Sequence, residues 1–266
     1  MNYIDCHNHL VPRVDDGSQS TKESLDSLRL LRSQGVTTAI LTPHVNSPFV
    51  DCTLTKEYLY KACEELKEAC AKEIEAFPAL LLGCEYYIDP TWETGMDPIT
   101  MAGTDVVMLE LPYGVMLDGV CRAVGITHDR GYRVLLAHPE KYNAFKYQWD
   151  EALRFLRESP DVFVQLESWD IGKHNEYSWR FIESRTATVI GTDSHGYHRK
   201  PSYDRAANAL LEWAQKDTGR REYAEQLLCR NARSMFMKTE KTMLKNRQDK
   251  AENVKNRNAE NKEESQ

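Results

Sequence analysis

The chain lacks several features that define common protein classes. Its seven cysteines form no Cys-x-x-Cys pair, which disfavours a cysteine zinc site, and their odd number and irregular spacing do not resemble a disulfide framework. No apolar run is long enough to span a membrane, and the first residues lack the basic and apolar regions of a secretion signal. We therefore expect a cytoplasmic protein with reduced thiols and no membrane insertion.

Positive charge is also scarce. The 34 lysines and arginines are outnumbered by 41 acidic residues, which gives a formal net charge of −7. This balance argues against general nucleic-acid binding, because such binding requires a basic surface. With 266 residues, 41% of them hydrophobic, the chain is long enough to form one large core.

Short apolar runs rich in β-branched residues alternate with helical patterns along most of the chain. We expect strands at residues 3–4, 37–41, 79–82, 106–109, 134–137, 162–166 and 188–190. We expect helices at residues 20–33, 55–76, 117–129, 149–158, 176–184, 202–215 and 221–236. This alternation predicts a parallel sheet covered by helices, as a closed or distorted barrel or as an open doubly wound sheet. No Gly-x-Gly-x-x-Gly follows the first strand, which disfavours a dinucleotide-binding sheet.

The last segment differs from the rest in composition. Residues 238–266 are rich in Lys, Glu, Asn, Arg and Gln and contain few aliphatic residues. Such a segment cannot bury enough apolar area to offset the entropy lost on folding. We therefore predict one globular domain over residues 1–237 and a disordered or frayed-helical tail over residues 238–266, with partner binding as an alternative role for the tail.

Ligand-type residues gather at the ends of the expected strands. His7 and His9 follow the first run, and their i, i+2 spacing places both imidazoles on one side of an extended strand. A His-x-His pair alone is weak evidence for a metal site. Most of the later strands also end in a histidine or a carboxylate, within the segments Thr42-Pro43-His44, Gly83-Cys84-Glu85, Glu110-Leu111-Pro112, Ala137-His138-Pro139-Glu140 and Asp193-Ser194-His195. Because the carboxyl ends of the strands build the active site of a β/α barrel, these residues together predict a metal centre.

The mixture of nitrogen and oxygen donors indicates which metals to expect. Five histidines with four or more carboxylates are too many for one zinc ion, which takes three or four protein ligands. They suit two or three borderline divalent ions such as manganese, iron or zinc, and Glu85 or Glu110 could bridge neighbouring ions. A site of this kind suits phosphoester hydrolysis, because the ions hold phosphate oxygens and lower the pKa of bound water.

In their order along the chain, these motifs resemble those of the polymerase-and-histidinol-phosphatase (PHP) superfamily. The opening segment Asp5-Cys6-His7-Asn8-His9-Leu10-Val11-Pro12, with Asp15-Asp16-Gly17, is most similar to the manganese-dependent protein tyrosine phosphatases of bacterial capsule and exopolysaccharide loci. The resemblance covers about residues 1–236 and implies a distorted seven-stranded, TIM-like β/α barrel. It also implies the metal ligands His7, His9, Asp16, His44, Glu85, Glu110, His138, Asp193 and His195. Asp15 is expected in a turn or behind the ligands.

By this resemblance, we expect hydrolysis of phosphotyrosine on a protein, such as the tail of a bacterial tyrosine autokinase that controls polysaccharide export. A cysteine-based mechanism is excluded, because it requires an arginine six positions after the cysteine, and none of the seven cysteines has one. We expect Cys6 and Cys84 to point away from the neighbouring ligands and pack in the core.

Two alternatives remain. The first is a PHP-type phosphatase of small molecules such as histidinol phosphate or a nucleotide, which should have a deep, enclosed pocket instead of an open site. The second is a non-catalytic, metal-stabilised regulator that binds kinase tails. The oligomeric state is left open.

Basic residues near the motifs depart from the family pattern. Lys141 stands where the family usually has an arginine, and it lacks the bidentate fork of a guanidinium. A second phosphate-binding arginine is expected after His195, and Arg199 or Lys200 can take that place. We expect these basic residues to hold phosphoryl oxygens, with His195 or Asp16 assisting protonation of the leaving group.

Two further departures lie beside the motifs. Arg13 stands where a glycine is typical, and it can equally be a solvated loop residue. Glu167, in Gln165-Leu166-Glu167-Ser168, stands where a small polar residue is commoner. These changes leave the predicted metal ligands intact and concern the choice of substrate.

Overall fold

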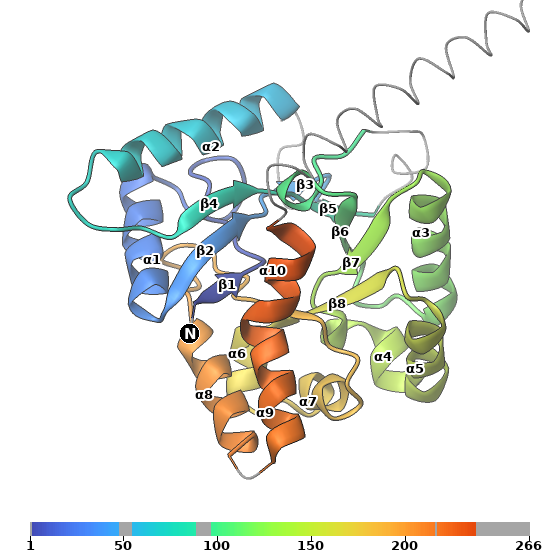
Figure 1. Ribbon diagram of the computed structural model, residues 1–266. Helices are drawn as coiled ribbons and strands as arrows, with labels where there is room; N and C mark the ends of the chain where they lie inside the picture. The colour runs from blue at the N-terminus through green and yellow to red at the C-terminus, as the bar shows by residue number, and fades with distance from the viewer. Residues whose placement is uncertain (1, 48–54, 89–96, 216, 238–266) are drawn as a thin grey trace, which may run out of the picture.

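The computed structural model describes residues 2–47, 55–88, 97–215 and 217–237 (Figure 1). The predicted tail therefore lies outside the described residues. The strands are β1 (Tyr3–Asp5), β2 (Val36–Leu41), β3 (His44–Val45), β4 (Ala79–Leu82), β5 (Glu85–Tyr87), β6 (Val106–Glu110), β7 (Arg133–Leu136), β8 (Val162–Glu167) and β9 (Val189–Gly191). The α-helices are α1 (Thr21–Ser33), α2 (Lys56–Ala71), α3 (Leu117–Asp129), α4 (Asn143–Tyr147), α5 (Trp149–Glu158), α6 (Ser168–Gly172), α7 (Glu176–Glu183), α8 (Tyr203–Trp213), α9 (Thr218–Glu225) and α10 (Asn231–Phe236).

The strands form two parallel sheets, one in the order β1-β2-β4 and one in the order β3-β5-β6-β7-β8-β9. A backbone hydrogen bond continues the pairing between the sheets, since Cys6 N–H, directly after β1, donates to the carbonyl oxygen of Ile190 in β9 at 3.2 Å. β9 and β1 approach so closely that a Cβ atom on Gly191 would lie 2.3 Å from the Cβ of His7. The strands therefore curve into an incomplete barrel.

The barrel is open at its amino end, on the side of β4 and β6. These two strands do not pair with each other among the described residues, and a short 3-10 helix, η2 (Met101–Gly103), packs against both. At the carboxyl end, by contrast, β5 pairs with β3 and β6. Strand pairing is therefore more complete at the end where the predicted ligands lie.

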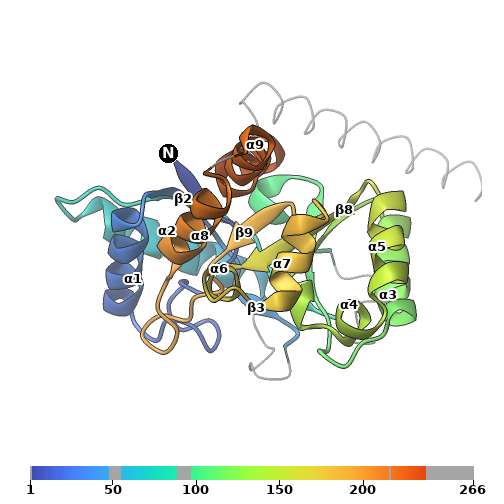
Figure 2. The same ribbon diagram turned by 90° about the horizontal axis from the view of Figure 1, so that it is seen from below.

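Side chains alternate between two apolar layers, as expected for strands buried on both faces. Ile40, Met108 and Leu135 point into the barrel, where Phe236 of α10 and Met101 also pack. The neighbouring residues on each strand point outward against the surrounding helices. Figure 2 shows these helices around the strands, with α1 on one side and α3 and α5 on the other.

The expected α/β alternation is confirmed, and the count of seven strands is not. Each expected strand is present, but the short pieces β3 and β5 follow β2 and β4 after brief breaks and pair separately. The expected helix at 221–236 begins earlier, at Thr218, and contains a π-helical segment at Gln226–Arg230. The five-residue helices α4 and α6 were not expected, because such short segments have no clear periodicity.

Three of the helix boundaries follow directly from local chemistry. The side chain of Ser20 accepts a hydrogen bond from Glu23 N–H and so begins α1, and Thr55 does the same for α2. Gly35, with φ of 90°, follows the end of α1 in the left-handed conformation that favours glycine.

Within the described residues, no helix is both long enough and apolar enough to cross a membrane. A cytoplasmic location stays a prediction from the sequence.

Candidate metal centre

Nine side chains converge at the carboxyl end of the barrel, and they are the nine predicted ligands. Eight of them are at most 8% exposed, whereas 46% of the Asp16 side chain is exposed. They come from nearly every strand: His7 and His9 after β1, Asp16 before α1, His44 in β3, Glu85 in β5, Glu110 at the end of β6, His138 after β7, and Asp193 and His195 after β9. The structure thus brings together residues that are up to 188 positions apart, from His7 to His195.

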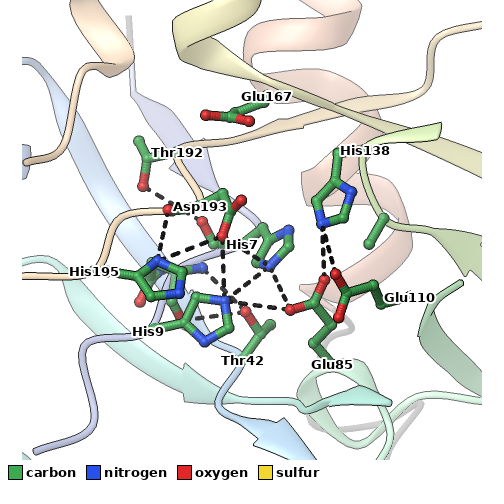
Figure 3. A network of polar contacts seen from close by, with 12 residues as sticks. His7, His9, Thr42, Glu85, Glu110, His138, Glu167, Thr192, Asp193 and His195 are labelled. Carbon is green, nitrogen blue, oxygen red and sulfur yellow. Dashed lines mark hydrogen bonds and ion pairs between the residues drawn. The ribbon is translucent and has the colours of Figure 1, made fainter. Parts of the chain in front are cut away.

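Glu85 lies at the centre of this cluster (Figure 3). Its Oε2 atom is 3.1 Å from His7 Nε2, 3.3 Å from His9 Nε2 and 3.0 Å from His44 Nδ1. Its other oxygen, Oε1, is 3.1 Å from His138 Nε2. Because the two oxygens face different imidazoles, this carboxylate is placed to bridge two ions.

The remaining ligands complete further groups of donors. Asp193 Oδ1 lies 3.3 Å from His9 Nε2, and Asp16 Oδ1 lies 3.4 Å from His195 Nε2. Four groups have their donor atoms within 4.8 Å of one another: His9-Asp16-His44-His195, His7-His9-Glu85, His7-His138-Asp193 and His44-Glu85-Glu110. The groups share members, as the ligand sets of adjacent ions do.

Two polar residues behind the cluster orient its first histidines. Gln165 Oε1 accepts a hydrogen bond from the backbone N–H of His138 at 3.1 Å, so the amide oxygen faces the site. The same oxygen lies 2.9 Å from His7 Nδ1, which must therefore carry the proton. Asp15 Oδ2 holds His9 Nδ1 in the same way at 2.8 Å. Both histidines consequently turn Nε2 toward the cluster, where this atom can bind a metal once it has lost its proton.

This donor set fits divalent cations. His7 Nε2 and His9 Nε2 lie 3.1 Å apart with their lone pairs toward each other, which is unfavourable unless a proton or a metal lies between them. Glu85 Oε2, Glu110 Oε2 and His44 Nδ1 are buried and have no hydrogen-bond partner in the part of the chain that the structure describes. Buried polar atoms without a partner are rare in folded proteins, and here they converge on one another.

The electrostatics of the cluster agree with this fit. Burial and the neighbouring Glu85 carboxylate raise the pKa of Glu110 to about 7. Burial favours neutral His7, but Glu85 and Asp193 outweigh it and raise the pKa of His7 to about 9. Burial lowers the pKa of His138 to about 4. Several carboxylates thus share few protons and repel one another, and bound cations would reduce this repulsion.

Asp15 and Asp5 support the cluster from behind. Asp15 is the turn residue that the sequence predicts, since it also accepts hydrogen bonds from the N–H groups of Gly17 at 2.9 Å and His44 at 3.0 Å. Asp5 is fully buried and accepts two hydrogen bonds from Thr192, both at 2.8 Å. This supporting role of Asp5 was not predicted. The position of Asp5 in the opening motif is the signal that could have indicated it.

Two of the clustered residues have left-handed backbones. His138 has φ of 32° and Asp193 has φ of 48°, a region that costs a non-glycine residue free energy. Each lies two residues after the end of a strand and turns its side chain toward the cluster. Non-glycine outliers of this kind are typical of functional sites, where surrounding contacts over-determine the backbone.

The predicted basic residues lie at the rim, but not all of them face the cluster. Arg199 Nη1 donates to Asp193 Oδ2 at 2.7 Å, and Lys141 Nζ lies 3.6 Å from the same oxygen. Lys200 is exposed, and within the described part of the chain no hydrogen bond or ion pair joins it to the nine side chains. Arg13 is exposed as well, with φ of 62°. The geometry therefore favours Arg199 over Lys200 next to the cluster.

Cys6 and Cys84 are fully buried and pack among apolar residues, as predicted. Desolvation by burial raises the pKa of both thiols, so neither is a thiolate near neutral pH. The six described cysteines are all free.

Comparison with known sequences connects this site to a family. Residues 3–237 match the model of the family described as capsular polysaccharide synthesis, CpsB/CapC. The tyrosine-protein phosphatase CpsB of Streptococcus agalactiae serotype V is 25% identical over 245 residues, which are 88% of this chain and 98% of the relative. The tyrosine-protein phosphatase YwqE of Bacillus subtilis is 25% identical over 230 residues, 79% of this chain and 84% of the relative.

Solved structures share the fold. A chain from the crystal structures of YwqE from Bacillus subtilis and CpsB from Streptococcus pneumoniae, described as unique metal-dependent tyrosine phosphatases, superposes with a TM-score of 0.75. It is 20% identical, and the match covers 88% of this chain and 94% of that one. The phosphotriesterase homology protein of Escherichia coli gives a TM-score of 0.56 at 10% identity, covering 88% and 98% of the two chains.

Proposed function

This chain belongs to the capsular polysaccharide synthesis family CpsB/CapC, and we propose that it is a metal-dependent phosphatase that hydrolyses phosphotyrosine in a protein. The observation that carries the proposal is the convergence of three imidazole nitrogens on one buried carboxylate oxygen of Glu85, at 3.0–3.3 Å. The tyrosine-protein phosphatase relative that covers 88% of this chain supports the choice of reaction.

We propose that the nine clustered side chains hold two to three divalent ions, with Mn²⁺ as the first choice and iron or zinc as alternatives. Mixed imidazole and carboxylate donors suit such borderline ions. The four overlapping donor groups supply the ligands, and Glu85 belongs to two of them. When bound, the ions would polarise phosphoryl oxygens and supply a nucleophilic water at neutral pH.

The residues at the rim would bind and orient the phosphoryl group. Arg199 and Lys141 are the cations next to Asp193, so we assign them to the phosphoryl oxygens. Asp16 and His195 face each other at 3.4 Å at the mouth of the site, where either, when it is not fully engaged by metal, can hold a proton for the leaving phenolate. Because a phenol has a pKa of about 10, this assistance is a minor contribution.

The open mouth favours a protein substrate over a small molecule. The side chains of Asp16 and Arg199 are 46% and 39% exposed, although the ligands beneath them are buried. A phosphotyrosine side chain can therefore enter while the polypeptide that carries it stays outside. We propose the tail of a bacterial tyrosine kinase, in the cytoplasm, as this substrate.

The test is hydrolysis by the Mn²⁺-loaded protein of a phosphotyrosine peptide, histidinol phosphate and a nucleotide, with and without chelator. We expect the peptide to be hydrolysed fastest and the chelator to abolish turnover. Turnover that survives the chelator would contradict the metal-dependent reaction. Faster hydrolysis of histidinol phosphate would contradict the protein substrate and leave the reaction type standing.

A further inference from the structure

Glu167 is a buried carboxylate at the rim that the proposed ligand set does not use. It ends β8, is 3% exposed and belongs to none of the metal-binding groups found among the described residues. Its backbone N–H donates to Glu140 Oε1 at 2.8 Å, which anchors this position at the strand end. Figure 3 shows its side chain on the far side of Asp193 from Glu85. Glu167 is therefore held beside the site without being part of the metal cluster.

The partners of Glu167 are the two cations that we assign to the phosphoryl group. Its Oε2 forms an ion pair with Lys141 Nζ, and its Oε1 lies 3.7 Å from Arg199 Nη1. Both cations also face Asp193, whose charge a bound ion would neutralise. Glu167 is then the carboxylate that continues to compete for Lys141 and Arg199 when the metals are present.

We propose that Glu167 is a specificity-determining residue that competes with the phosphoryl group for Lys141 and Arg199 and keeps the affinity for phosphate low. This inference rests on the proposed phosphatase function. A phosphate dianion that approaches the two cations must separate Lys141 from Glu167 and is repelled by the carboxylate. The product therefore leaves readily, and the substrate must gain affinity from its other contacts.

The nature of residue 141 fits this competition. The ammonium of Lys141 is a compact point charge on a flexible stem, with three donors that can turn between Glu167 and a phosphoryl oxygen. Its side chain is 20% exposed, so the path toward the mouth is open. Lys141 can therefore move from the Glu167 carboxylate to a phosphoryl oxygen without breaking the rigid pair of hydrogen bonds that an arginine would form.

The test is the affinity of the Mn²⁺-loaded protein for inorganic phosphate, measured by isothermal titration calorimetry in the wild type and in Glu167→Gln. We expect the dissociation constant to fall about tenfold, equivalent to about 1.4 kcal/mol. Glu176→Gln is the matched control, because it removes an exposed carboxylate that pairs with another basic residue, Arg180, within α7. An unchanged dissociation constant in Glu167→Gln would overturn the proposal.

A second outcome separates competition from a structural role. If Glu167 only held Lys141 in place for phosphate, Glu167→Gln would bind phosphate more weakly, and that result also overturns the proposal. Glu167→Ser removes the same charge with less bulk, and it tests the inference if the glutamine variant does not fold. Metal content is measured on the same samples, so that a lost ion is not mistaken for altered phosphate binding.

Phosphate binding does not depend on turnover, so this test can fail separately from the proposed function. A wild type that binds phosphate but does not hydrolyse the phosphotyrosine peptide contradicts the proposed function and leaves the role of Glu167 open to the same measurement. With an active enzyme, Glu167→Gln should show a lower KM for the peptide and stronger product inhibition by phosphate.

Discussion

The floor and the rim of this site are built differently. On the floor, imidazoles and carboxylates are buried at strand ends, and residues such as Gln165 and Asp15 fix the direction of each ring. At the rim, Lys141 ends the short 3-10 helix that follows His138, and Arg199 lies in a loop; both share their charges with Asp193 and Glu167. The orientation of the floor side chains is therefore fixed by the backbone and by several neighbours, whereas each basic side chain at the rim has more than one carboxylate partner. Substitutions should affect metal binding on the floor and substrate affinity at the rim.

The largest effect is expected from removing the central carboxylate. Glu85→Gln takes away a charge that faces four imidazoles and leaves the donor groups on both sides of it incomplete. Because metal-ion catalysis contributes several kcal/mol, we expect phosphotyrosine hydrolysis to fall by about 10³-fold or more, with loss of bound Mn²⁺. Activity assays and metal analysis check this. Glu57→Gln, an exposed change in the first turn of α2, should retain both properties. Normal metal content in Glu85→Gln would contradict its place in the ligand set.

Loss of an orienting residue should cost less than loss of a ligand. Gln165→Leu removes the acceptor that holds His7 Nδ1 and leaves the imidazole itself in place. Partners behind a ligand typically contribute 10–100-fold to metal affinity, so we expect the Mn²⁺ dissociation constant to rise by about that factor. Equilibrium dialysis measures it, with the exposed Gln215→Leu as the control. An unaltered affinity would mean that packing alone orients His7.

The pH dependence of metal binding tests the charge balance of the floor. Without metal, Glu110 and His7 have pKa values raised to about 7 and about 9, so both hold protons at pH 6. Ligands must lose these protons to bind metal, so affinity should rise with pH, by about tenfold per unit for each proton released. Below about pH 7 both groups contribute, and between about 7 and 9 only His7 of the two does. Mn²⁺ titrations at several pH values, in buffers of different ionisation enthalpy, count the protons. An affinity independent of pH between 6 and 8 would refute these protonation states.

The sequence predicted the floor far better than the rim, for a physical reason. Predicted ligands such as His7 and His138 lie close to strand ends, and parallel strands bring those ends together regardless of the loop sequences. The ion pair between Lys141 and Glu167 joins two different strand ends through side chains, and no local pattern encodes that contact. The same holds for Gln165, which resembles any strand residue until its position opposite His7 is known.

The interruptions before β3 and β5 were also not predicted from the sequence. β3 and β5 are only two and three residues long, and each follows its predecessor after a brief interruption. Periodicity over so few residues carries no signal, so only the first segment of each pair, at residues 37–41 and 79–82, was predicted as a strand. The breaks matter for function, because β3 begins with His44 and β5 begins with Glu85.

A smaller effect is expected from the contact that joins two loops of the site. Glu23 is 5% exposed, and its carboxylate accepts hydrogen bonds from the backbone N–H groups of Gln19 at 2.8 Å and Tyr197 at 2.5 Å. These loops carry Asp16 and His195. Glu23→Gln would place an amide group where both partners are donors, and this would loosen the two loops. We therefore expect about a tenfold loss of affinity only for the ion that Asp16 and His195 would hold. Metal stoichiometry at limiting Mn²⁺ checks this, and a uniform loss of all ions would instead indicate general unfolding.

The smallest effect should come from Arg13, an exposed loop residue whose side chain has no ion pair or hydrogen bond among the described residues. Its φ of 62° costs about 1–2 kcal/mol in a residue with a Cβ atom, and glycine avoids this cost while gaining entropy in the unfolded chain. We therefore expect Arg13→Gly to change the free energy of unfolding by less than about 1 kcal/mol and kcat/KM for a phosphotyrosine peptide by less than about twofold. Denaturant unfolding and steady-state kinetics measure the two quantities. A selective rise in KM would instead show that Arg13 contacts the peptide, and the rim would then extend from the loops after β7 and β9 to the loop after β1.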